Sequence, residues 1–341
     1  MTDGTYLGPQ PVAEVPDLAG PLEAVLEQWQ DVRRWVAALP GTTRVFLVGA
    51  GGSHLNVQAA QYVLDTGARV PASAVNSDEF FFRAPPGVGP GAVVLLLSGT
   101  GETPETVRAA RWAVSRGAAV AAVTLKGDSP VARAAGTAFV GGSGDANQVL
   151  LQFLALALLE REGQDVSARL EALRALPGAL EKTVHAFEQR AAEVVSVMKD
   201  VPVTHVLASG PLFGPASVLT SCYLQEMQWM HATTINADEF FQGPFEVIDS
   251  TTRTIVFLGE DATRPMGERV RTFLDTYSGP TCYLDTRDLE MPGVAADQRS
   301  FVAPLVVAAL VARLAAHYAA QRGYALAGRR YMWTVDYAIT S

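Results

Sequence analysis

The hexapeptide NSDEFF at residues 76–81 returns as NADEFF at residues 236–241, an offset of 160 residues. Two apolar runs repeat at the same offset: VFLVGAG from Val45 with HVLASGP from His205, and VVLLLSG from Val93 with RTIVFLG from Arg253. A single short match can arise by chance, but three elements in one register indicate an internal duplication. We therefore expect two similar domains.

Each copy alternates short aliphatic runs with Gly/Ser turns and longer amphipathic stretches. The expected strands are residues 45–48, 93–97 and 119–125 in the first copy and residues 204–208, 254–258 and 281–284 in the second. This alternation predicts doubly wound parallel sheets with helices on both faces, a three-layer α/β/α arrangement. The two domains are expected at residues 41–165 and 201–322.

Three segments fall outside these domains. Residues 1–40 are expected to be a helical segment, with one helix over 21–38. Residues 166–200 lack strand signals and contain few helix breakers besides Pro177, so they predict a helical connector. Residues 323–341 form a C-terminal tail.

Composition excludes several classes of protein. The 341 residues are 49% hydrophobic, which is enough for two buried cores, and the formal net charge is -9. An acidic chain without a Lys/Arg cluster lacks the surface that neutralises phosphates, so no nucleic-acid partner is expected. Cys222 and Cys282 lie far apart in the sequence, which predicts neither a disulfide framework nor a metal site.

No membrane attachment is expected, and the predicted compartment is the cytoplasm. The N-terminus carries acidic residues and prolines where a signal peptide would carry a basic and then an apolar run. The apolar stretches at residues 149–159 and 302–311 are shorter than the roughly 20 residues of a membrane span. Both predict buried core helices.

A loop rich in hydroxyl groups, SGTGET at residues 98–103, directly follows an expected strand and opens a helix. Ligands of parallel sheets collect at such strand ends, and a helix N-terminus offers unpaired N–H donors to an anion. The loop therefore predicts a phosphate site formed by Ser98, Gly99, Thr100, Glu102 and Thr103. The turn GAGGSHL adds Gly52 and Ser53 at the same sheet edge.

Two other interpretations of these loops compete with a phosphate site. The glycines after Gly49 do not follow the G-x-G-x-x-G spacing, and no Walker lysine follows them, which disfavours a nucleotide site. The hydroxyls of residues 98–103 could simply cap a helix. Capping alone does not explain why the second copy reads GEDATRP at this register and lacks the hydroxyl cluster.

S-G-T-G-E-T at residues 98–103 resembles the phosphate loop of the sugar isomerase (SIS) family, which has the form Ser-x-Ser/Thr-Gly-x-Thr after an apolar strand. The resemblance spans essentially the whole chain. NADEFFQGPFEVID and GRRYMWTVDY look closest to fructosamine-6-phosphate deglycases and, more distantly, to the isomerase half of glucosamine-6-phosphate synthase. It implies a two-SIS subunit that forms a homodimer, with active sites near the interface and the C-terminal tail nearby. It calls for neither a cofactor nor a metal.

The family's catalytic carboxylate matches Glu226, in LTSCYLQEMQWMH. Desolvation among Tyr223, Met227 and Met230 is expected to favour proton transfer by this group. A glutamate on a solvated helix surface is the alternative.

The chain departs from the family pattern at Gln242, where relatives carry a histidine in E-F-F-H-G-P. Glutamine cannot exchange a proton near neutral pH, so this general-acid step is lost, moved or unnecessary. His231, Glu239 and Glu246 are candidate substitutes, although a lone histidine in the position of His231 is more often a residue at a helix end.

A lysine-based imine mechanism has few candidates, because the only lysines are Lys126, Lys182 and Lys199 and none falls in an expected site. In the tail, where relatives carry a lysine, this chain has Arg329, Arg330 and Thr334. Arg330 is a candidate clamp for an anionic substrate, or else forms a surface ion pair.

Two functions remain open on the sequence. The first is an enzyme that acts on a ketosamine or amino-sugar 6-phosphate, by deglycation or aldose-ketose isomerisation through an enediol or enaminol. The second is a non-catalytic sensor of sugar phosphates. The retained Glu226 favours the enzyme, whereas Gln242 favours the sensor.

Overall fold

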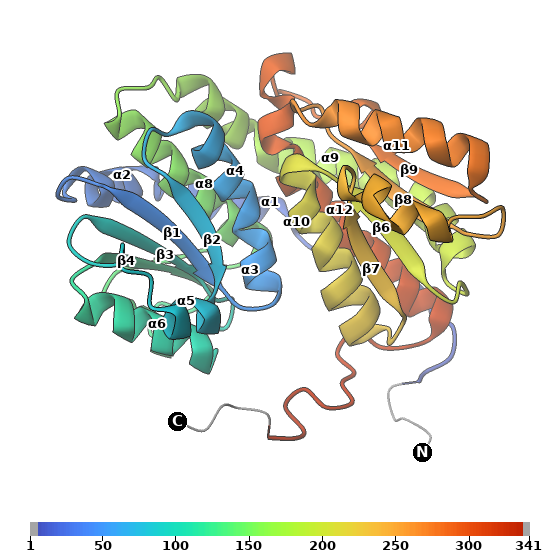
Figure 1. The fold of residues 1–341 in the computed structure, drawn as a ribbon, viewed down its shortest axis with the longest axis horizontal. Helices are drawn as coiled ribbons and strands as arrows, with labels where there is room; N and C mark the ends of the chain where they lie inside the picture. The colour runs from blue at the N-terminus through green and yellow to red at the C-terminus, as the bar shows by residue number, and fades with distance from the viewer. Residues whose placement is uncertain (1–5, 337–341) are drawn as a thin grey trace. The chain divides into compact units, whose positions relative to one another are not determined.

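The computed structural model describes residues 6–336, which divide into two compact units (Figure 1). The first unit comprises residues 17–181 and 291–305. The second comprises residues 182–290 and 306–336 together with the N-terminal segment up to residue 16. Each unit contains one copy of the repeat.

The first unit is built on a five-stranded, fully parallel sheet in the order β2-β1-β3-β4-β5. The strands are β1 (Arg44–Gly49), β2 (Ala72–Asn76), β3 (Ala92–Leu97), β4 (Ala119–Thr124) and β5 (Ala138–Val140). Its helices are α1 (Ala19–Leu26), α2 (Trp29–Ala37), α3 (Gly52–Asn56), α4 (Gln58–Gly67), α5 (Ser77–Arg83), α6 (Pro104–Ser115), α7 (Pro130–Ala135) and α8 (Gly144–Arg161). The expected helix over 21–38 is thus two helices, α1 and α2.

Alternation along the strands explains why helices cover both faces of this sheet. Phe46 and Val94 point into one core cluster, which also contains residues of α5, α6 and α7. Their neighbours Leu47 and Leu95 are also buried, and successive strand residues point to opposite faces. Because both faces are buried, the strands are continuous aliphatic runs.

The second unit repeats this topology with a parallel sheet in the order β7-β6-β8-β9. The strands are β6 (Thr204–Ala208), β7 (Ala232–Asn236), β8 (Thr254–Leu258) and β9 (Thr281–Asp285). The helices after β6 are η1 (Gly210–Leu212), α10 (Phe213–Val218) and the π-helix η2 (Leu219–Met227), and those after the later strands are η3 (Glu239–Gln242), η4 (Pro244–Val247), α11 (Arg264–Tyr277) and η5 (Thr286–Asp288). The 3-10 helix η6 (Ala296–Gln298) belongs to the first unit. The shared strand order confirms the two α/β domains predicted from the repeat.

The repeated hexapeptide is a folding element in both copies. Asn76 and Asn236 each end a strand, and their Oδ1 atoms accept hydrogen bonds from the backbone N–H groups of Asp78 (3.2 Å) and Asp238 (3.0 Å). Four residues beyond each asparagine, a fully buried phenylalanine, Phe80 or Phe240, enters the core. The motif therefore turns the chain and anchors the segment that follows β2 or β7.

Two long helices contribute residues to both units. The connector expected at residues 166–200 is α9 (Ser167–Met198), which divides between the units after Glu181, and α12 (Arg299–Arg322) divides after Leu305. Residues 296–322 are apolar and long enough to cross a bilayer, contrary to the expected shortfall in length, but 78% of their most apolar window is buried inside the protein. The burial is that of a core helix.

Candidate functional site

The hydroxyl-rich loop lies between β3 and α6, at the carboxyl edge of the first sheet. Ser98 is buried, and its Oγ lies 3.2 Å from Thr103 Oγ1. Thr100 is exposed, and its Oγ1 accepts a 3.2 Å hydrogen bond from the backbone N–H of Glu102. The hydroxyls thus fix the loop from within, while its outer rim faces solvent at the start of a helix.

Close packing against the β4–α7 turn sets the shape of this loop. The Gly99 carbonyl accepts a 2.9 Å hydrogen bond from the backbone N–H of Leu125. Gly101 has φ +71°, and a Cβ there would lie 2.2 Å from Ser129 Oγ. A residue other than glycine is therefore excluded at position 101 by both conformation and space.

A lysine adjoins the loop, although no sequence pattern predicts one there. Lys126 Nζ lies 3.4 Å from Glu102 Oε1, and both side chains are more than half exposed. The pair sits in solvent, where such contacts contribute little stability. Lys126 therefore adds an exposed positive charge beside the predicted phosphate loop.

The neighbouring β1–α3 turn places Gly52 and Ser53 at the start of α3, both partly buried. The next residue, His54, is not among the site residues predicted from the sequence. Burial lowers the pKa of His54, although the Val75 backbone and Glu79 act in the opposite direction. His54 is thus mainly a neutral imidazole beside this turn at neutral pH.

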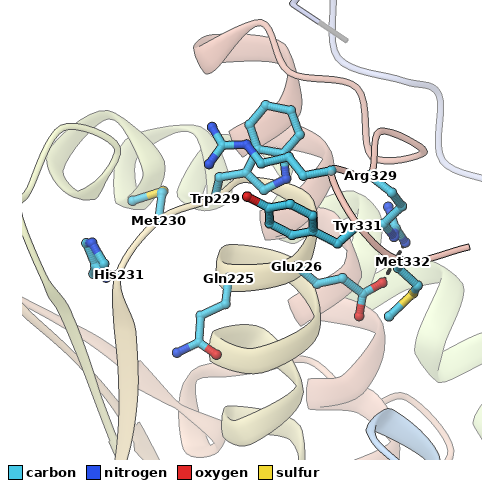
Figure 2. Close-up of a pocket in the computed structure, with 9 residues that line it drawn as sticks. Gln225, Glu226, Trp229, Met230, His231, Arg329, Tyr331 and Met332 are labelled. Carbon is cyan, nitrogen blue, oxygen red and sulfur yellow. Dashed lines mark ion pairs between the residues drawn. The ribbon is translucent and has the colours of Figure 1, made fainter. Parts of the chain in front are cut away.

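The second unit contains a pocket of about 450 Å³ around the end of η2 (Figure 2). It is lined by Gln225, Glu226, Trp229, Met230, His231, Arg329, Arg330, Tyr331 and Met332. The helix and the C-terminal tail thus meet around Glu226. A π-helix such as η2 is rare and is frequently found at functional sites.

Glu226 is held by an arginine of the tail. Arg329 Nη2 lies 2.6 Å from Glu226 Oε1, with side-chain exposures of 10% and 25% respectively. The expected surroundings of Glu226 were apolar, but the structure gives it a cationic partner. One helical turn earlier, burial and the nearby Glu226 charge raise the pKa of the Cys222 thiol to about 11, so Cys222 is not a thiolate nucleophile at neutral pH.

The pocket is also lined by an aromatic side chain, Trp229, and a second arginine, Arg330. Trp229 has φ +53°, an uncommon conformation for a bulky side chain, and the Arg330 guanidinium lies 4.0 Å from its ring centroid. Strained residues of this kind persist where their surroundings hold them, often at functional sites. His231 also lines the pocket, but it is exposed and precedes β7 rather than ending a helix.

Gln242 and Glu239 lie beyond the last residue of β7, whereas Glu226 lies near its first residue. The position of Glu226 follows from its neighbour Gln225, whose side chain donates a 2.6 Å hydrogen bond to the carbonyl of Ala232, the first residue of β7. Gln242 and Glu239 are exposed in η3, after the last residue of β7, and neither is among the residues that line the pocket. A five-residue strand spans about 16 Å, so the length of β7 separates Gln242 from Glu226 along one chain.

The sequence did not identify Arg329 as the partner of Glu226. The residues are 103 positions apart, and the only signal was the basic pair Arg329-Arg330 in a stretch where relatives carry a lysine.

Among residues 6–336, no three His, Cys, Asp or Glu side chains gather so that they could hold a metal ion.

The sequence of the chain is similar to a known domain family and to characterised deglycases. Residues 39–155 match the model of the SIS domain. The fructosamine deglycase FrlB of Bacillus subtilis is 32% identical over 320 residues, which cover 90% of this chain and 97% of the relative. A fructoselysine 6-phosphate deglycase of Escherichia coli is 26% identical over 117 residues, 34% of each chain.

Solved structures of other proteins share this fold over about nine-tenths of the chain. A Bacillus subtilis protein assigned as a phosphosugar isomerase has a TM-score of 0.87 at 31% identity, over 92% of this chain and all of that one. The C-terminal domain of glucosamine-fructose-6-phosphate aminotransferase from Francisella tularensis shares the fold, with a TM-score of 0.74 at 17% identity, over 89% of this chain and 96% of that one. The repeat, the two parallel sheets and these relationships show that the chain belongs to the SIS family of phosphosugar isomerases and deglycases.

Proposed function

We propose that this protein deglycates or isomerises a ketosamine or amino-sugar 6-phosphate, with Glu226 as the group that moves the proton. The observation that carries the proposal is Glu226 in the wall of a 450 Å³ pocket, in a chain 32% identical to a fructosamine deglycase over 320 residues. The predicted site residues Ser98, Thr100 and Thr103, with Gly52 and Ser53 on the adjacent turn, would bind the phosphate.

For a ketosamine, the chemistry requires one proton to move between adjacent carbons. The Glu226 carboxylate would take the proton from C1 while the C2 carbonyl oxygen receives a proton from an acid group or from water, which gives the 1,2-enaminol. The carboxyl group would then return its proton to C2, and the resulting iminium nitrogen would release a proton to the same acid group or to water. The product is an imine of the aldose 6-phosphate, and water hydrolyses it to the sugar phosphate and the free amine. The same transfer on a sugar with a C1 hydroxyl is an aldose-ketose isomerisation.

Gln242 would hold a substrate oxygen by hydrogen bonding without exchanging a proton. Its exposed position at the far end of β7 from Glu226 supports a role toward a second copy of the chain. We therefore propose a homodimer in which the loop from Asp238 to Glu246 serves the neighbouring subunit. The candidate substitutes for the missing acid are then His231, which lines the Glu226 pocket, and Glu239, which lies beside Gln242.

The test is turnover of a ketosamine 6-phosphate by the purified protein, followed by NMR detection of the released amine. Glu226→Gln should abolish turnover without weakening ligand binding, since it removes the proton carrier but keeps the shape of the side chain. Glu193→Gln, on the exposed face of α9, is the control and should retain activity. Equal turnover by Glu226→Gln and wild type would refute the role of Glu226.

A non-catalytic sensor is the second candidate, favoured by Gln242 and by the ion pair that engages Glu226. A protein that binds phosphosugars but turns over none of them would support this alternative.

A further inference from the structure

Only one of the three guanidinium nitrogens of Arg329, Nη2, contacts Glu226. Its Nη1 group donates to the tail carbonyls of Leu326 (2.7 Å) and Gly328 (2.8 Å), and its Nη2 group contacts Glu226 Oε1 at 2.6 Å. Its buried Nε has no hydrogen-bond partner among the described residues. A donor buried without a partner costs free energy comparable to that of a lost hydrogen bond.

The unused donor and the donor shared with Glu226 form one edge of the guanidinium. Nε–H and the neighbouring Nη2–H point in parallel, in the geometry that binds both oxygens of a carboxylate or phosphate. Glu226 contacts the guanidinium through Nη2 only, whereas Nη1 is fixed to the backbone of the tail. The edge is therefore preorganised for an oxyanion and is only half used.

The side chain is also placed where a ligand would meet it. Arg329 is 90% buried and lines the same pocket as Glu226, and its guanidinium lies 5.3 Å from the ring centroid of Trp333, an exposed residue of the tail. Figure 2 shows the Arg329 and Glu226 side chains pointing toward each other, Arg329 from the tail and Glu226 from the helix. A cation in low-dielectric surroundings binds an anion more strongly than one in water does.

We propose that an oxyanion of the substrate replaces Glu226 on Arg329: it accepts hydrogen bonds from both Nε and Nη2 and so releases the Glu226 carboxylate to act as the base. The inference rests on the proposed role of Glu226. The oxyanion is either the sugar phosphate or a carboxylate on the amine portion. Binding of a correctly charged substrate would then be coupled to freeing of the base.

The experiment measures binding of four unreactive amino-hexitols by calorimetry, so that its outcome does not depend on turnover. They are 1-deoxyhexitols joined through nitrogen to glycine or to ethylamine, each with and without a 6-phosphate. Their reduced C2 cannot form the enaminol. Wild type, Arg329→Gln, Arg329→Lys and the surface control Arg190→Gln are compared, with melting temperatures to verify folding.

In Arg329→Gln, the affinity for analogues that carry one of the two oxyanions should fall roughly 10- to 100-fold relative to matched analogues without it, as expected for loss of a charged hydrogen-bonded contact. The affected pair identifies the phosphate or the carboxylate as the group that Arg329 binds. Arg329→Lys should recover only part of the loss, because an ammonium lacks the planar fork. Arg190→Gln should bind all four analogues like wild type.

An equal loss for all four analogues, or no loss for any, would overturn the proposal, because Arg329 would then support only Glu226 or the fold. Wild-type turnover is measured separately on the unreduced ketosamine 6-phosphates. A selective loss of binding together with an inert wild type would contradict the enzymatic function but leave the oxyanion contact of Arg329 in place.

Discussion

The Thr263 hydroxyl donates a 2.7 Å hydrogen bond to Asp261 Oδ1, in the loop that corresponds at the 160-residue offset to the hydroxyl-rich loop of the first unit. Asp261 Oδ1 also accepts a 2.9 Å hydrogen bond from the Thr263 backbone N–H. Asp261 Oδ2 lies 2.4 Å from where a Cβ on Gly259 would sit. The second copy therefore fills this loop with its own carboxylate, whereas the first copy has at this position the loop that we propose binds phosphate.

Asp261→Ala should lower the free energy of unfolding by about 1 to 2 kcal/mol, because two donors at the start of α11 lose their acceptor. Denaturant unfolding measures the change. Phosphosugar affinity should remain that of wild type. A variant with unchanged stability, or one with weakened binding, would show that the carboxylate has a different role.

Replacing Ser98 and Thr103 together by alanine should weaken phosphosugar binding by a few kcal/mol, at about 1.5 to 3 kcal/mol for each charge-assisted hydrogen bond. Calorimetry gives the affinity. Thr263→Ala is the matched control, since it removes the corresponding hydroxyl from the second copy and should leave the affinity unchanged. Unaltered affinity in the double variant would end the assignment of the phosphate loop.

We expect Asp145 to make the stability of the protein depend on pH. Burial raises the pKa of this carboxyl, in the first turn of α8, from 3.8 to about 6. The folded state then binds more protons than the unfolded state between these values, so stability falls as pH rises through this window.

Asp145→Asn removes this pH-dependent cost. The free energy of unfolding of the variant minus that of wild type should increase by about 2 kcal/mol between pH 4.5 and pH 7.5. Denaturant titrations at the two pH values measure the difference. A constant difference across this range would mean that Asp145 does not titrate there.

The chain should be a homodimer at micromolar concentration, because Gln242 and Glu226 lie at opposite ends of β7 and we propose that a second copy brings them into one site. Light scattering determines the mass against 36.2 kDa for one chain. A fully active monomer would contradict the shared site.

Gln242→His should restore a titratable group where relatives carry histidine. We expect higher deglycase activity on fructosamine 6-phosphates, by up to about 10²- to 10⁴-fold for full general acid catalysis, with a new pH limb near 6.5. Steady-state kinetics across pH measure it. If wild type already matches an authentic deglycase, histidine at this position is dispensable.

The repeat by itself determined the fold. A hexapeptide and two aliphatic runs at one offset predicted two parallel α/β domains, and β6 and β8 have the predicted bounds. Such signals are local, because the pattern of buried side chains and the Asn turn are set by neighbouring residues. The strands β2 and β7 were missed, since ASAVN and ATTIN lack a long aliphatic run.

Only the tertiary structure decided the partners of the site residues. The pairing of Glu226 with Arg329 joins a helix to a tail 103 residues away, and neither sequence pattern specifies the other. The separation of Gln242 from Glu226 likewise depends on the path of β7 between them. Local patterns specify strands and turns, whereas the contacts of a charged side chain depend on which distant segments fold against it.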